Sequence, residues 1–156
     1  MRWVILLCFL ALGSSNLTAA EAADEEASPI RIFTTGERYE DVVENIRMAI
    51  VERGLLVSGS LHISDMLNRT GPDLGFKQVF SKAESVEFCS ALMSHKMAQA
   101  APENVVTCPF TISVYIKTEE PDQVYVAYRR PHLNGDSDEA YQAIVDLMEG
   151  VIQDSI

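Results

Sequence analysis

The chain has 156 residues, with 12 lysines and arginines against 23 aspartates and glutamates, so its formal net charge is −11 at pH 7. A field of that sign repels phosphate backbones and anionic lipid headgroups, which disfavours nucleic acids and membrane surfaces as partners recognised by charge. The length is enough for one compact domain and too short to argue for two.

The N-terminus has the pattern of a secretory signal. Arg2 precedes an apolar run over residues 3–12, and small and polar residues follow as far as position 20. The run is too short to cross a bilayer as a helix. We therefore predict a signal peptide over residues 1–22, whose removal takes Cys8 with it and leaves a soluble periplasmic or secreted protein.

A short acidic leader, residues 23–29, precedes the single domain that we predict over residues 30–156. The leader consists mainly of Ala, Glu and Asp and has little to bury, so we expect it to be disordered. The stretch IRIFTT at 30–35 predicts a strand. Apolar residues at steps of three and four then predict an amphipathic helix over 38–53, which Gly54 stops.

The middle of the chain gives weaker signals. The stretch LLVSGSLHIS at 55–64 indicates a second strand, and residues 64–75 indicate a loop or one short helical turn because they contain Gly and Pro. FKQVF at 76–80 indicates a third strand. Ser81 and Glu84 then have the spacing of a capping box, which predicts a second helix over 82–100.

The last third of the chain has the clearest alternation. In VVTCPFTISVYIK, residues 105–117, the even positions from Val106 to Ile116 are apolar, which predicts a strand. Residues 123–130 return as its hairpin partner, and Ser137 caps a final helix with one apolar stripe. The element order predicts a two-layer α+β domain, with a mostly antiparallel sheet of about five strands and helices packed on one face.

Two cysteines remain once the signal is removed. An even count in an oxidising compartment indicates one disulfide, between Cys89 and Cys108. On the predicted helix Cys89 shares a face with Met93 and Met97, and Cys108 belongs to the inward row of its strand, so both sulfurs point into the interface between helix and sheet. Such a bridge stabilises the fold by about 3 kcal/mol.

Two other uses of this region stay open. The cysteine pair could cycle as a thiol–disulfide or sulfur-related redox centre, although no C-x-x-C motif is present. A haem or copper carrier could use Met93, Met97 or His95 as ligands. A methionine stripe more often fills a core, and His95 lies on a different side of the predicted helix, so we predict no cofactor.

Arg129, Arg130 and His132 make the only dense positive cluster in this acidic sequence, with Tyr128 beside them. A small anionic ligand could dock there through charge-assisted hydrogen bonds, and the alternative is pairing with surface carboxylates. The sequence contains no G-x-S-x-G motif and no glycine-rich phosphate loop. We therefore predict no catalytic residues and favour a role without catalysis.

Two stretches, VVENIRMAIVERGLLVSGSLHI and CPFTISVYIKTEEPDQVYVAYRRP, resemble the family catalogued as domain of unknown function 302, and the resemblance covers roughly residues 32–150. It implies an α+β fold with a curved sheet, export in bacteria and assembly as homodimers, and it supplies no catalytic residues. The family's Phe-Gly-Asn-Pro-like turn is replaced here by VFSKAESVEFCSALM, so no site built on that turn is carried over. The leading interpretation is an exported accessory domain, stapled by one disulfide, that binds a small anionic ligand or a periplasmic protein.

Overall fold

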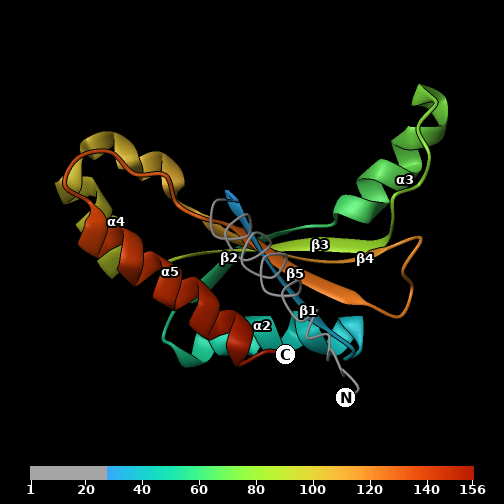
Figure 1. Ribbon diagram of the computed structural model, residues 1–156, viewed down its shortest axis with the longest axis horizontal. Coiled ribbons are helices and arrows are strands. Elements are labelled where there is room, and N and C mark those ends of the chain that lie inside the picture. Colours follow the sequence, from blue (N-terminus) through green and yellow to red (C-terminus); the bar gives the residue numbers. More distant parts are fainter. Residues whose placement is uncertain (1–27) are drawn as a thin grey trace, which may run out of the picture.

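The computed structural model describes residues 28–156, so the predicted signal peptide and most of the acidic leader lie outside the described residues. The elements in chain order are β1 (Ile30–Thr35), α2 (Tyr39–Glu52), β2 (Leu56–Leu61), α3 (Ile63–Leu74), β3 (Phe80–Cys89), α4 (Ala91–Ala100), the 3₁₀ helix η1 (Pro102–Thr107), β4 (Phe110–Lys117), β5 (Val124–Arg129) and α5 (Asp138–Gln153) (Figure 1). In this described part of the chain, no helix is long and apolar enough to cross a membrane.

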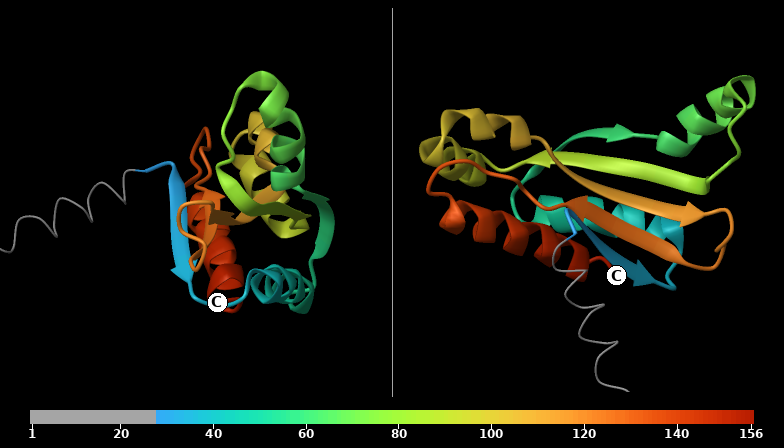
Figure 2. Two further views of the ribbon diagram at one scale, coloured as in Figure 1. Left: turned by 90° about the vertical axis from the view of Figure 1, so that its right-hand side faces the viewer. Right: turned by 45° about the horizontal axis from the view of Figure 1, so that its top comes forward.

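The five strands form one antiparallel sheet in the order β1-β5-β4-β3-β2. Helices α2 and α5 lie side by side on one face of this sheet, whereas α3 and α4 lie towards its two ends (Figures 1 and 2). The architecture confirms the predicted α+β fold with a mostly antiparallel five-stranded sheet. We call the side under α2 and α5 the covered face, and the opposite side the open face.

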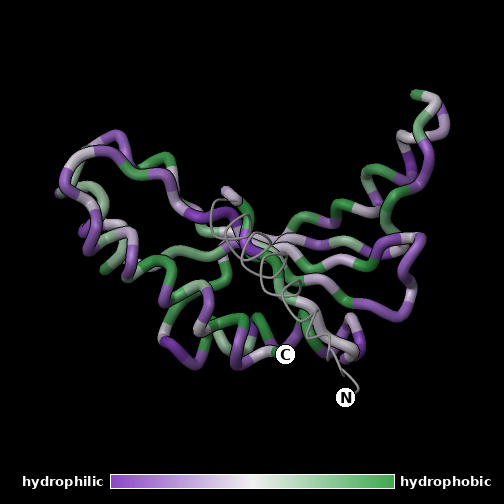
Figure 3. Tube along the Cα trace, in the orientation of Figure 1, coloured by the Kyte–Doolittle hydropathy of each residue, from purple (hydrophilic) through white to green (hydrophobic). Residues whose placement is uncertain are grey.

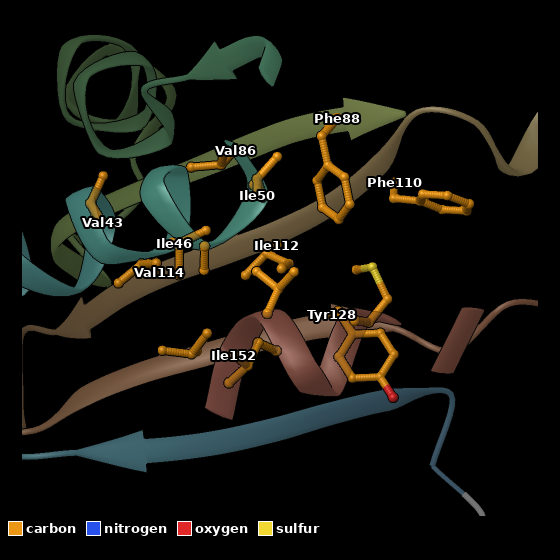
Figure 4. Close-up of a cluster of buried hydrophobic side chains, with 14 of the residues drawn as sticks. Val43, Ile46, Ile50, Val86, Phe88, Phe110, Ile112, Val114, Tyr128 and Ile152 are labelled. Atoms are coloured by element: carbon orange, nitrogen blue, oxygen red, sulfur yellow. The ribbon is translucent and has the colours of Figure 1, made fainter. Parts of the chain in front are cut away.

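The hydrophobic core fills the space between the covered face and the two helices. Helix α2 turns Val43, Ile46 and Ile50 towards the sheet, where they meet inward side chains of β3 and β4 such as Val86 and Ile112 (Figure 4). The polar residues gather instead in outer loops such as the β4–β5 turn (Figure 3). Burial of each large aliphatic side chain contributes roughly 1.5–3 kcal/mol, so this layer holds the helices on the sheet.

The elements predicted from strong periodicity are confirmed. The strand at 30–35, the helix within 38–53 and the hairpin partner within 123–130 form where the pattern placed them. The stripe of the last helix is also confirmed, because Ala140, Ile144 and Met148 are buried against the sheet. Three- and four-residue spacing therefore placed both helices of the covered face correctly.

The predicted helix over 82–100 is wrong in its first half. Residues 80–89 form β3, and the helix begins only at Ala91, where the side chain of Ser90 accepts a hydrogen bond from the amide of Met93 at 3.4 Å. Glu84 is not a capping residue, because it lies on the covered face and forms an ion pair with Arg47 of α2. Because Glu84 is a charged residue at an inward-facing position, the sequence of β3 lacks the apolar–polar alternation that would have predicted a strand.

The segment between β2 and β3 also differs from the prediction. The loop or single helical turn expected over 64–75 is a longer helix, α3, which ends at Gly75 in the left-handed conformation with φ of 76°. Strand β2 is shorter than predicted, and of the third strand expected over 76–80 only Phe80 is in a strand. Gly71 and Pro72 indicate a loop in the sequence, but here they lie in the last turn of α3.

The strand predicted from residue 105 begins only at Phe110. The preceding residues form η1, so Val106, expected to face inwards, is 84% exposed. The buried Asn104 holds this turn in place, because its Nδ2 donates to the carbonyl oxygens of Met97 and Asn134, both at 3.0 Å. We call α4 and η1 together, residues 91–107, the end segment.

Candidate binding site on the open face of the sheet

The predicted disulfide is present. Cys89 and Cys108 are joined, with their Cα atoms 6.3 Å apart. The expected setting of Cys89 is wrong, because this residue is the last of β3 and shares no helix face with Met93 or Met97. Cys108 lies just before β4 and packs against the core. The bond therefore closes the end segment into a loop, because it joins the end of β3 to the residue just before β4.

Small side chains occupy the middle of the open face. Ala83 of β3, Ser113 of β4 and Ala127 of β5 point away from α2 and α5, and Ser113 and Ala127 are direct partners across the two strands. The hydroxyl of Ser113 lies 2.7 Å from that of Ser85 on the neighbouring strand. We call Ala83, Ser113 and Ala127 the small-residue floor. Their short side chains leave space above the sheet.

A cavity of about 880 Å³ lies over this floor. Its walls include Ile30 and Ile32 of β1 and, from the end segment, Val106 and Thr107, and its lining also reaches Ile144 and Met148 of α5. Small-molecule sites in proteins usually have volumes of about 300–1,000 Å³ and mostly apolar linings with a few polar groups. In both size and lining the cavity fits a small organic ligand.

Aromatic side chains bound one end of the cavity. The rings of Phe80 and Tyr115, which both line it, meet edge to face with centroids 5.4 Å apart. Tyr115 in turn stacks on Tyr125 of β5, with centroids 5.1 Å apart and planes 8° from parallel. Burial is the main reason why the pKa of Tyr115 is raised above its usual value. We call Phe80, Tyr115 and Tyr125 the aromatic row.

Cationic side chains gather at the other end. Arg129, Arg130 and His132, predicted as ligand-binding residues, all line the cavity where β5 ends beside the start of β1. The amide of Arg130 donates to the carbonyl oxygen of Pro29 at 2.9 Å, and its Nη1 donates to that of Ser28 at 2.8 Å. We call Arg129, Arg130 and His132 the cationic rim.

Tyr128, the fourth predicted ligand-binding residue, is placed differently. Its ring lies among the buried side chains of the covered face (Figure 4), and its hydroxyl donates to Glu149 of α5 at 3.1 Å. Burial and the nearby Glu149 carboxylate raise the pKa of this phenol. Tyr128 is among the residues that line the cavity, but its hydroxyl is engaged with Glu149 on the covered side.

The candidate metal-binding side chains do not share one environment. Met97 is fully buried in the core and Met93 packs against that core, whereas His95 is exposed. Within residues 28–156, no group of three or more His, Cys, Asp or Glu residues is arranged to hold a metal ion. The two methionines act here as core side chains.

A polar cluster on the covered face was not predicted. The carboxylate of Glu84, a residue only 8% exposed, is paired with Arg47 and lies 3.4 Å from Nδ1 of His62. Arg47 also donates to Ser60 at 2.8 Å. Burial, and next the charge of Glu84, raise the pKa of Tyr39 to about 12. This cluster joins α2 to β2 and β3, so we assign it to the fold.

The family model described as domain of unknown function DUF302 matches residues 31–154. Among solved structures, the crystal structure of the uncharacterized conserved protein DUF302 from Bacillus stearothermophilus is similar, with a TM-score of 0.68 and 12% sequence identity over 83% of this chain and 100% of that one. At that identity the likeness concerns the fold alone. No curated protein shows significant similarity to the chain.

Proposed function

The chain belongs to the DUF302 family of domains of unknown function, so we propose a function from its own cavity. We propose that it is an exported, non-enzymatic domain. It binds, on the open face of its sheet, a small organic anion that has an apolar part. The apolar part lies over the small-residue floor and against the aromatic row. The anionic group lies at the cationic rim.

The observation that carries this proposal is the charge of the cavity lining. The chain has 23 acidic residues, yet among the described residues that line the cavity there is no Asp or Glu, and the charged ones are Arg129 and Arg130. Guanidinium groups bind carboxylates, sulfonates and phosphates through paired, charge-assisted hydrogen bonds. In an acidic protein, a cavity with such a lining favours an anionic occupant.

The same lining favours binding over catalysis. Its polar groups, apart from the rim, are hydroxyls such as those of Thr111 and Ser113. Glu84 of β3 and Glu149 of α5, two carboxylates of the covered layer, are both engaged with other side chains there. A general acid or base must reach the substrate by a hydrogen bond, and these two groups lie on the other face.

The experiment uses two related probes, 1-anilinonaphthalene-8-sulfonate and the uncharged N-phenyl-1-naphthylamine. The substitution Ala127→Leu fills the floor, so we expect fluorescence titrations to show at least tenfold weaker binding of both probes. The matched substitution Ala91→Leu, at an exposed position of α4, should leave both affinities unchanged. Equal affinities in the two variants would contradict the proposed site.

The rim is tested separately. Arg129→Gln removes one cation, so we expect about tenfold weaker binding of the sulfonate, since a hydrogen bond to a charged group contributes about 1.5–3 kcal/mol. The uncharged probe should bind as before, because its apolar rings contact the floor and the aromatic row. A loss of affinity that is the same for both probes would argue against an anion site at Arg129.

Export is the second part of the proposal. The signal pattern of residues 1–22 and the bond between Cys89 and Cys108 both support it. Mass spectrometry of the protein from a periplasmic fraction should find an N-terminus near residue 23, and a cytosolic protein that keeps residue 1 would refute export. The redox, haem or copper, and homodimer interpretations stay predictions; the packing of Cys108 against the core favours a structural bond.

A further inference from the structure

Strand β1 begins beside the cationic rim, and its first residue lines the cavity. Ile30 is paired with Arg129, and hydrogen bonds from Arg130 hold the carbonyl oxygens of Pro29 and Ser28. The same antiparallel course brings residue 28 alongside the segment that follows β5. Whatever precedes Ser28 must therefore leave the domain beside the cationic rim.

The residues that precede Ser28 carry the opposite charge. The sequence there is ADEEA, residues 23–27, with Asp24, Glu25 and Glu26 in succession. Because an extended chain spans at most about 3.6 Å per residue, the backbone from Asp24 to Ser28 can reach no farther than about 14 Å. Arg130 of the cationic rim contacts Ser28 directly, so the tether keeps the three acidic residues within reach of the rim.

We propose that the acidic leader docks on the cationic rim of its own domain and competes there with the anionic ligand, an inference that rests on the proposed function for the identity of the site. Tethering gives the leader an effective concentration in the millimolar range at the rim. Its ion pairs are partly exposed to solvent, so they weaken as salt is added. The leader therefore lowers the affinity for an anionic ligand several-fold at low salt, and this effect disappears at high salt.

Charge favours this occupant over a second copy of the protein. Another whole chain would bring a net charge of −11 up to a protein of equal charge, and it would pay the entropic cost of association. The leader brings its carboxylates without that cost. Docking within one chain is independent of protein concentration, and this property separates the two occupants.

The first experiment detects docking without any ligand. The leader variant combines Asp24→Asn, Glu25→Gln and Glu26→Gln. The control variant combines Glu44→Gln, Glu119→Gln and Asp122→Asn, which removes the same charge from exposed positions elsewhere. Each chain is expressed from the full coding sequence and compared with the wild type by amide NMR at about 20 mM and about 500 mM salt.

We expect the leader variant to shift the amide signals of Arg129, Arg130 and His132 towards the positions that the wild type reaches only at high salt. The control variant should leave these signals unchanged. Rim signals that are the same in the wild type and the leader variant would overturn docking. Rim signals that depend on protein concentration would overturn it too, in favour of a second copy.

The second experiment tests competition with the probe 1-anilinonaphthalene-8-sulfonate. At low salt the leader variant should bind it about three- to tenfold more tightly than the wild type and the control variant, and the difference should vanish at high salt. Equal affinities at low salt would overturn competition. If the rim signals shift but no chain binds the probe, docking is supported and the proposed function fails, so the two failures can be told apart.

Discussion

The two faces of the sheet are built by alternate residues of the same strands, but one face carries large buried side chains and the other carries small ones. In β4, Ile112 is fully buried beneath the helices, whereas the next residue, Ser113, faces the cavity. In β5, Val126 and Ala127 differ in the same way. Large side chains on one face recruit helices that close it. Small side chains on the other face leave room for a ligand.

The largest expected effect tests the covered face. Phe88→Ala removes a fully buried ring that packs edge to face on Phe110, so unfolding should cost about 3–5 kcal/mol less. Ser113→Ala, on the open face, removes one hydroxyl pair and should cost about 1 kcal/mol or less. Urea denaturation of both variants measures the contrast. Equal losses would break the distinction between a packing face and a binding face.

The disulfide tests how firmly a wall of the open face is held. Replacing both Cys89 and Cys108 by Ala frees the end segment in the unfolded chain, so the free energy of unfolding should fall by about 3 kcal/mol. Val106 and Thr107 of this segment line the cavity, so binding of the fluorescent sulfonate should weaken as well. A stability loss with full binding would show that the wall stays in place without the bond.

Substitutions at Gly54 and Gly135, which both have a positive φ, distinguish the cost of backbone strain from the cost of close packing. A Cβ at Gly135 would clash with the carbonyl oxygen of Ala100, whereas one at Gly54 would meet nothing within 4 Å. Gly54→Ala should cost about 1 kcal/mol, from its positive φ alone. Gly135→Ala should cost about 2 kcal/mol or more, because the loop after β5 must also move away from α4. Thermal unfolding compares the two, and equal costs would exclude close packing at Gly135.

The smallest expected effect concerns Tyr39, which lies beside the polar cluster of Arg47 and Glu84 on the covered face. The pKa of Tyr39 is about 12 in the folded protein, mainly through burial, and its ordinary value is 10.0. The folded state therefore holds this proton more tightly, so stability is complete below pH 10 and falls as the pH rises from 10 towards 12. In Tyr39→Phe the decline over that interval should be shallower. Parallel curves of unfolding midpoint against pH would show that this phenol is not buried as described.

Periodicity placed most of the covered face from sequence, because helices α2 and α5 and the strands β4 and β5 have local patterns that match their burial. It failed at β3, where Glu84 is buried by pairing with Arg47 from a distant element. The spacing of Ser81 and Glu84 matched a capping box, and no local signal revealed the ion pair. Tertiary contacts decided that segment.

The candidate site was only half predictable. The cluster of Arg129, Arg130 and His132 is visible in the sequence as adjacent charges. The small-residue floor is not, because Ala83, Ser113 and Ala127 become neighbours only through the order of the strands. Single small residues in strands are too common to indicate a cavity before that order is known.

The pairing of β1 with β5 has a consequence for biosynthesis. Residue 30 finds its partner at residue 129, so the first strand to be translated is among the last to be incorporated, and it waits until most of the chain has left the ribosome. Contacts between such distant segments slow folding, because a long loop must close first. A chain that folds late stays extended for longer, which is compatible with the export proposed above.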